Sequence, residues 1–121
     1  MTSYKDLVVW KRSIDLVIEI YKLTDNFPKE EIYGLTSQMR RSSVSISSNI
    51  AEGSMRGTKK DFRNFLIIAF GSGAELETQI VISKRLPKTM HLDYTSVEKP
   101  LDEIMRMLNK FISQLEKDTT H

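Results

Sequence analysis

The sequence predicts an all-α protein, a bundle of four helices, and three observations lead to this fold class. Apolar residues recur at the helical period of 3.6 over four long segments. The chain has few helix breakers, with five glycines and three prolines in 121 residues, and several of them stand between the segments. The length suits one domain around a single core, which we expect to span residues 1–121. We expect the four helices at about residues 5–24, 29–55, 58–86 and 94–117.

Composition excludes several kinds of protein. The chain has no cysteine, so disulfides and thiolate metal sites are excluded. The N-terminus has no basic segment before a long apolar run, and we therefore expect no signal peptide. No uninterrupted apolar stretch approaches the ~20 residues of a membrane span. We expect a cytoplasmic protein without a membrane partner.

The first helical segment has two apolar faces. One face consists of Leu7, Trp10, Ile14, Val17, Ile18 and Tyr21. At ~100° per residue, a second set lies roughly 140° around the helix. This second set consists of Val9, Leu16, Ile20 and Leu23. Because a lone bundle needs one buried face per helix, we assign the first face to the core and the second set to a contact between subunits.

The later segments are bounded by turn and capping residues. Pro28 suits the first turn of the second helix, and Gly57 suits a C-terminal cap. Thr58 and Asp61 resemble a capping box at the start of the third helix. The fourth helix has one apolar face, and Pro100 either belongs to its first turn or kinks it.

The third segment, like the first, carries apolar residues beyond its core face. The additional set consists of Ile67, Phe70, Ala74 and Val81. A helix that is apolar nearly all round is buried nearly all round. We expect this set to pack between subunits; the alternative is that the helix lies more centrally within a monomer.

Basic residues are concentrated in the middle of the chain. Residues 40–63 contain six Lys/Arg and two Asp/Glu, whereas residues 1–39 and 64–121 each carry a net charge of −1. This surplus suggests a phosphate-binding surface for nucleic acid, although +4 is modest against footprints of about 6–10 phosphate contacts. The alternative is a solvated face with salt bridges to glutamates. The candidate residues are Arg40, Arg41, Arg56, Lys59, Lys60 and Arg63.

Candidate catalytic and metal-binding groups favour structural roles. Asn49 and Glu52 lie beside the core face of the second helix, so we expect a buried polar pair that stabilises the fold, with Glu52 bound to a basic or N–H donor. Glu75 and Glu77 suggest a carboxylate metal site, but neither His91 nor His121 follows a glutamate by three residues. No nucleophile–base pair is evident. We expect no enzyme activity, no metal and no cofactor.

Several runs of residues carry a resemblance to a known family. The chain resembles the four-helix-bundle proteins encoded in bacterial 23S rRNA intervening sequences, over most of residues 4–86. The SNIAEG run and the GS…ELE run are distinctive together, whereas the fourth segment matches only in character. The matching runs are Asp6–Lys11, Thr24–Pro28, Tyr33–Leu35, Gln38–Ile46, Ser48–Gly53, Phe65–Ser72 and Glu75–Glu77.

The resemblance implies an up-down-up-down antiparallel bundle that assembles as a homopentameric ring. It also implies similarity to the accessory protein of diversity-generating retroelements, which associates with reverse transcriptase and nucleic acid. Two functions follow as hypotheses. The first is a nonenzymatic oligomeric adaptor that binds nucleic acid, RNA above all, through the basic residues. The second is a structural oligomer that docks a protein partner such as a reverse transcriptase without touching nucleic acid.

Overall fold

The structure, a computed structural model, describes residues 3–119, with side chains to residue 117. These residues form four α-helices and two short 3-10 helices, and they contain no strand. The all-helical class with four helices is therefore confirmed. The elements in chain order are η1 (Tyr4–Asp6), α1 (Val8–Thr24), η2 (Lys29–Glu31), α2 (Leu35–Ser54), α3 (Lys59–Arg85) and α4 (Thr95–Thr119).

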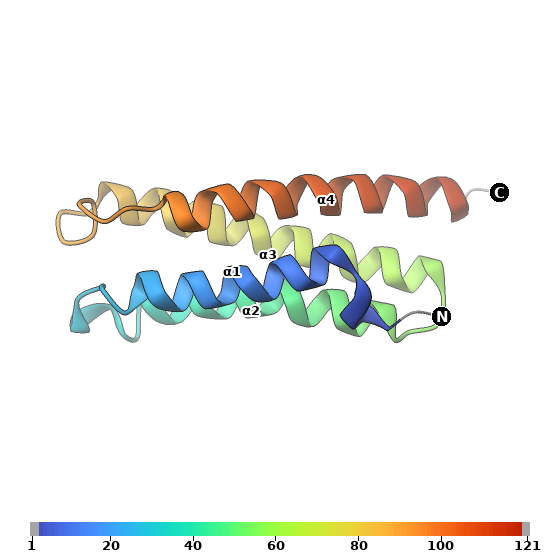
Figure 1. The fold of residues 1–121 in the computed structure, drawn as a ribbon, viewed down its shortest axis with the longest axis horizontal. Helices are drawn as coiled ribbons and strands as arrows, with labels where there is room; N and C mark the ends of the chain where they lie inside the picture. The colour runs from blue at the N-terminus through green and yellow to red at the C-terminus, as the bar shows by residue number, and fades with distance from the viewer. Residues whose placement is uncertain (1–2, 120–121) are drawn as a thin grey trace.

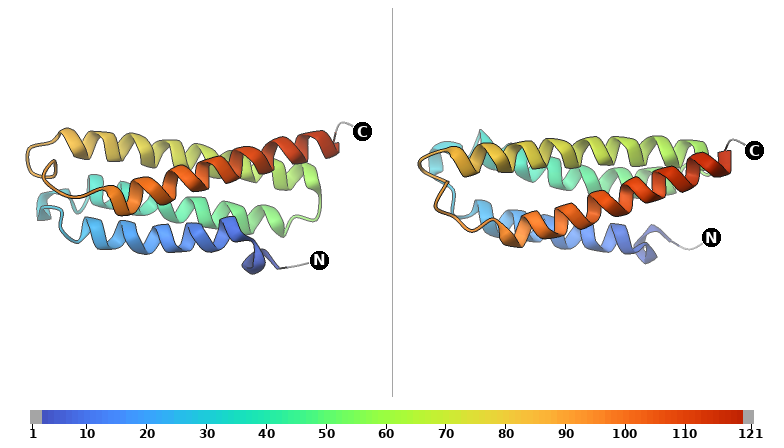
Figure 2. Two further views of the ribbon diagram at one scale, coloured as in Figure 1. Left: turned by 45° about the horizontal axis from the view of Figure 1, so that its top comes forward. Right: turned by 90° about the horizontal axis from the view of Figure 1, so that it is seen from above.

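Successive helices lie side by side and run in opposite directions along one long axis (Figure 1). Helix α1 contacts α2 and α4, and α3 contacts the same two helices (Figure 2). Helices α1 and α3 therefore lie diagonally across the bundle, and their outer faces point in opposite directions. The α2–α3 turn lies at the same end as the start of α1 and the end of α4. The α1–α2 connection and the α3–α4 loop lie at the other end.

Local capping explains where the helices begin. The hydroxyl of Thr58 accepts a hydrogen bond from the N–H of Asp61 at 3.1 Å, and the preceding Gly57 has a φ of +89°. Helix α2 begins later than the expected residue 29, because residues 29–31 form η2. The carboxylate of Glu31 then accepts the N–H of Leu35 at 3.1 Å, which caps the start of α2.

The structure reverses our assignment of the two faces of α1. The residues that we assigned to a subunit contact are core residues with at most 7% of their surface exposed, namely Val9, Leu16, Ile20 and Leu23. The face that we assigned to the core is largely at the surface, with Ile18 51% exposed. Buried Ser13 interrupts the apolar spacing of the true core face. Its hydroxyl donates to the carbonyl of Trp10 at 2.6 Å, so a polar residue is tolerated there.

The second apolar set of α3 does lie at the surface of the chain. Ile67 and Val81 are 43% and 49% exposed, Ala74 is exposed, and Phe70 is half-buried. By length and composition α3 is apolar enough to cross a membrane, although core helices of soluble proteins pass the same test. Only a third of its most apolar segment is buried within the chain. An apolar outer face of α3 therefore remains to be covered.

Candidate nucleic-acid interface

The six predicted basic residues fall into two groups. Arg40 and Arg41 lie in the first half of α2, whereas the other four surround the α2–α3 turn. Arg41 and Arg56 are 15 residues apart on or next to one helix, which corresponds to about 22 Å along its axis at 1.5 Å per residue. The two groups therefore cannot contact the same phosphate.

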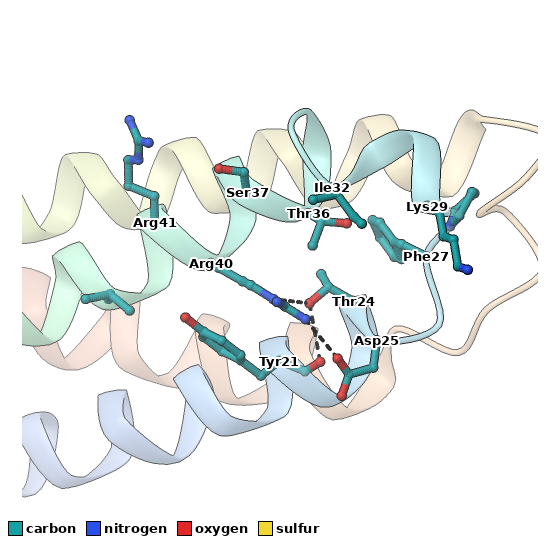
Figure 3. Close-up of a pocket in the computed structure, with 12 residues that line it drawn as sticks. Tyr21, Thr24, Asp25, Phe27, Lys29, Ile32, Thr36, Ser37, Arg40 and Arg41 are labelled. Atoms are coloured by element: carbon teal, nitrogen blue, oxygen red, sulfur yellow. Dashed lines mark hydrogen bonds and ion pairs between the residues drawn. The ribbon is translucent and has the colours of Figure 1, made fainter.

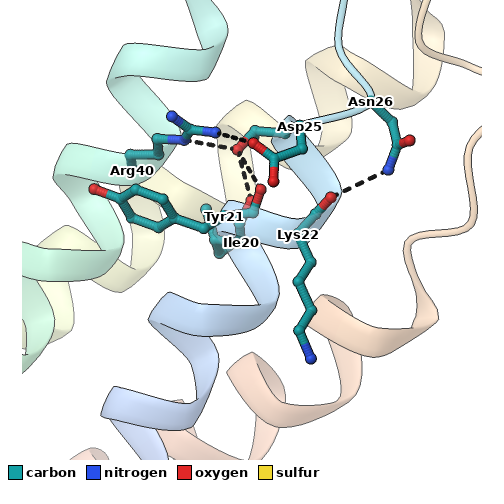
Figure 4. A network of polar contacts seen from close by, with 7 residues as sticks. Ile20, Tyr21, Lys22, Asp25, Asn26 and Arg40 are labelled. Atoms are coloured by element: carbon teal, nitrogen blue, oxygen red, sulfur yellow. Dashed lines mark hydrogen bonds and ion pairs between the residues drawn. The ribbon is translucent and has the colours of Figure 1, made fainter.

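Arg40 is held in place by the end of α1. Its Nε donates to Oγ1 of Thr24 and its Nη2 donates to Oδ1 of Asp25, both at 2.9 Å (Figure 3 and Figure 4). The guanidinium carbon also lies 4.4 Å from the ring centroid of Tyr21, within cation–π range. These contacts bind α2 to α1 and give Arg40 a structural role.

Three of the four basic residues around the α2–α3 turn also have partners within the chain. Nη2 of Arg56 donates to Glu52 at 2.8 Å, and its guanidinium lies 4.9 Å from the ring centroid of Phe65. Nε of Arg63 donates to the carbonyl of Ile112 at 3.3 Å, which joins α3 to α4. Lys59 also interacts with another group of the chain. These contacts fix side chains that remain wholly or partly exposed.

Two of the six side chains show no partner within the part of the chain that the structure describes. They are Arg41, on the exposed side of α2, and Lys60, in the first turn of α3. Exposed cations without a competing carboxylate are the ones best able to contact phosphate. Arg41 and Lys60 are therefore the strongest candidates for a ligand contact.

The prediction that Glu52 is buried was wrong. Its side chain is 54% exposed and forms an i,i+4 ion pair with Arg56. Glu52 follows the buried Ile50 by two positions, or about 200° around a helix, so the helical period itself places it away from the core. Such an exposed pair contributes little to stability, about 0.3–0.5 kcal/mol.

Asn49 is half-buried, on the side of α2 that faces α3. Its Nδ2 donates to the carbonyl of Ser45 at 2.8 Å and to the Ser45 hydroxyl at 3.0 Å. The Ser45 hydroxyl lies 2.8 Å from that of Ser72 on α3. Asn49 thus belongs to a small polar contact between two helices, not to a pair with Glu52.

Positive charge is concentrated at one end of the bundle. We define the basic end as residues 3–11, 52–63 and 110–118, which contain eight Lys/Arg and five Asp/Glu. The neutral end, residues 19–34 and 84–99, contains six of each. The surplus at the basic end does not depend on the distant Arg40 and Arg41.

The perturbed pKa values belong to contacts at the neutral end. An ion pair between Lys88 and Glu30 joins the α3–α4 loop to η2; the hydrogen bond lowers the pKa of Glu30 and raises the pKa of Lys88. The backbone N–H of Thr95 lowers the pKa of Asp93, which precedes α4. Burial raises the pKa of Tyr94, whose hydroxyl donates to a backbone carbonyl at 2.9 Å. Each of these groups has a structural partner.

The fold creates a pocket beside Arg40 that sequence reasoning did not predict. This pocket of about 640 Å³ lies between the end of α1 and the first turns of α2 (Figure 3). Among residues 3–117, no three His, Asp or Glu side chains come together in a way that could hold a metal ion. No short motif indicates the pocket, because its walls come from two helices and their connection.

Comparison with known proteins identifies the family. The family model described as 23S rRNA-intervening sequence protein matches residues 5–110. A solved structure from Bacteroides thetaiotaomicron, described as a protein with unknown function from the S23 ribosomal protein family, is similar with a TM-score of 0.75 and 28% identity. The match covers 87% of this chain and 98% of that one. No curated protein matches the chain. This chain belongs to the 23S rRNA-intervening sequence protein family.

Proposed function

We propose that this protein is a nonenzymatic homo-oligomer that binds RNA through its basic end. The observation that carries the proposal is the unequal distribution of charge: the basic end has a surplus of three positive charges and the neutral end has none. Contacts to phosphate supply most of the nonspecific affinity of proteins for nucleic acid. Lys60, in the first turn of α3, lies at this end, whereas Arg41 lies about 22 Å away along α2 and is not part of this surface.

One subunit offers a small electrostatic footprint, and self-association enlarges it. The outer faces of α1 and α3 are apolar and lie on different sides of the bundle, so the α1 face of one subunit can meet the α3 face of the next in a head-to-tail contact. On α1 the exposed apolar residues include Ile14 and Ile18, which replace the buried set that we first assigned. On α3 the exposed apolar residues include Ile67 and Val81.

Repetition of this head-to-tail contact with a constant rotation between neighbouring subunits closes into a ring, and the family resemblance supports five subunits. Monomers seldom expose apolar patches beyond a few hundred Å². Burial in lipid is disfavoured because Glu75 and Glu77 interrupt the apolar sequence of α3. A ring whose subunits lie along its axis collects all the basic ends on one rim. RNA then meets one surface with several times the charge of a single subunit.

The proposal is tested by the affinity for a structured RNA hairpin at two salt concentrations. We expect log K to fall linearly as log salt rises. Lys60→Glu reverses a charge at the basic end, and Lys99→Glu makes the same change on an exposed lysine of the neutral end. Lys60→Glu should weaken binding and reduce the salt slope by about 1, whereas the control should change both less. Equal effects of the two variants, or no binding at low salt, would contradict the proposal.

A second candidate function, a scaffold that docks a protein such as a reverse transcriptase, is favoured by the neutral end. Tyr33 is 96% exposed there, beside exposed Ile32, and Met90 of the α3–α4 loop is 58% exposed. Exposed aromatic residues and methionine are enriched at protein interfaces. Capture of the partner should then survive nuclease treatment and be lost with Tyr33→Ser. If nuclease treatment abolishes capture, the partner is held through RNA, and the result supports the RNA-binding function.

A further inference from the structure

The pocket beside Arg40 has the size of a small-molecule site. Its volume of about 640 Å³ lies within the roughly 300–1,000 Å³ that such sites occupy. Arg40 is 16 residues before Arg56, which places the pocket about 24 Å along α2 from the basic end. The pocket is therefore separate from the surface that we propose for RNA.

A fixed cation forms one wall of the pocket. Figure 3 shows Arg40 extending from α2 toward Thr24 and Asp25, with Tyr21 beside it. A guanidinium has five N–H donors, and the contacts to Thr24 and Asp25 account for two of them. The remaining donors have no partner within the described residues. Because its position is already fixed, Arg40 loses little conformational entropy when a ligand accepts these bonds.

A buried hydroxyl without a partner also lines the pocket. Thr36 is only 6% exposed, and its Oγ1 has no hydrogen-bond partner within the described structure. Buried polar atoms are satisfied in the large majority of cases, so an unsatisfied one calls for an explanation. Thr36 lies in the first turn of the 20-residue helix α2, where the helix dipole favours negative charge. Both features suit a ligand that carries acceptor oxygens.

The remaining walls are apolar and the rim is basic. Phe27 is buried against the core, while Ile32 and Val44 expose 49% and 40% of their surface. Lys29 and Arg41 lie on opposite sides of the pocket, with both side chains exposed (Figure 3). An inorganic anion would leave the apolar walls in contact with water, and a neutral apolar ligand would not use the cations. The lining therefore suits a ligand with an apolar body and an anionic group.

We propose that this pocket binds a nucleotide-sized organic anion. Its flat body lies against Ile32 and Val44, and a polar edge of the body accepts hydrogen bonds from Arg40. Its phosphate lies at the first turn of α2, where the Thr36 hydroxyl donates to it and the flexible side chain of Lys29 reaches it from the rim. The site needs only one chain and does not depend on RNA binding at the basic end.

The test uses AMP, with adenosine and inorganic phosphate as the two partial ligands. Methyl-resolved NMR of the full chain reports where each binds. We expect AMP to shift the methyl signals of Thr36, Ile32 and Val44 and to leave those of Ile67 and Ile68 on α3 unchanged. Adenosine and phosphate should each bind more weakly than AMP, because each uses only part of the lining. No shift at millimolar AMP, or equal shifts over both sets of methyl groups, would overturn the proposal.

Three variants and a control test the named contacts by calorimetry. Lys29→Ala should weaken AMP binding by roughly fivefold or more, because it removes a charge-assisted contact with the phosphate. Arg41→Ala should weaken AMP binding by a smaller factor, because it removes only a positive charge on the opposite rim. Lys99→Ala, at an exposed lysine of α4, should leave the affinity unchanged. Thr36→Val exchanges the hydroxyl for a methyl group; the free protein should melt no lower, while AMP binds less tightly. Unchanged affinity in all three variants would overturn the proposal.

Discussion

Gly53 sets the distance between α2 and α3, and its replacement by alanine tests the packing of the bundle. A Cβ at position 53 would lie 2.6 Å from Cβ of Phe65 and 3.3 Å from the backbone oxygen of Phe62. Neither of these atoms can be moved by rotating a side chain, since both are fixed to the backbone of α3. The two helices must therefore separate to admit the new methyl group.

The size of the effect follows from two opposing terms. Overpacking a core typically costs about 1–3 kcal/mol, and contacts to fixed atoms belong in the upper part of that range. Alanine improves helix propensity over glycine by about 1 kcal/mol. We expect Gly53→Ala to lower the free energy of unfolding by about 1–2 kcal/mol, which is roughly 4–8 °C in melting temperature for a chain of this size.

Two glycines of the facing helix α3 serve as controls in the same thermal and urea unfolding assay. A Cβ at Gly71 meets nothing within 4 Å, so Gly71→Ala should raise the free energy of unfolding by up to about 1 kcal/mol. A Cβ at Gly73 meets the flexible side chain of Met105, which can move aside. Gly73→Ala should therefore lower the free energy of unfolding by less than Gly53→Ala does. A Gly53→Ala protein as stable as the unmodified chain would refute this account of the α2–α3 contact.

Three further predictions concern capping, pH and the outer face of α3. Thr58→Ala removes the cap of α3 and should cost about 1 kcal/mol in urea unfolding; no change would mean that the cap is dispensable. The pKa of Asp93 is lowered by the N–H of Thr95, so its stabilising contribution is full above the unfolded-state pKa and is lost as the pH falls through the folded-state pKa. Asp93→Ala should therefore lose less stability than the unmodified chain over that acidic range, as followed by melting temperature, and equal losses would contradict this. Ile67→Glu should reduce the molar mass of the assembly in gel filtration without loss of helicity, whereas Ser113→Glu on an exposed part of α4 should not.

The number of helices and most of their boundaries could be predicted because their signals are local. Gly57 and Thr58 mark a boundary through backbone chemistry that acts within a few residues, whereas Pro28 begins the short helix η2 and not α2. The orientation of α1 could not be predicted, because two apolar faces compete and buried Ser13 interrupts the spacing of the true core face. A serine that bonds its own helix is compatible with burial, and the apolar pattern alone does not reveal it.

The positive charge of the candidate site could be predicted from the sequence, whereas the contacts of its side chains could not. The basic surplus is a property of composition, so it could be counted before any fold was known. The ion pair of Arg40 with Asp25 joins residues 15 apart across a helix connection, and it depends on how α1 and α2 pack. The exposure of Glu52, unlike the ion pair of Arg40, could have been predicted from the sequence. The helical period places Glu52 about 200° around α2 from Ile50, and the prediction ignored that angle. The pocket beside Arg40 exists only once both helices and their connection are in place.

The molar mass of the protein in solution tests the central claim most directly, because the proposed ring both covers the apolar faces of α1 and α3 and collects the basic ends. Multi-angle light scattering at micromolar concentration should report five subunits of 14.0 kDa, about 70 kDa in total. That mass should persist at high salt, because apolar contacts hold the ring. A mass of 14.0 kDa under the same conditions would contradict the account, because a monomer would leave both faces exposed and RNA with a single basic end to bind.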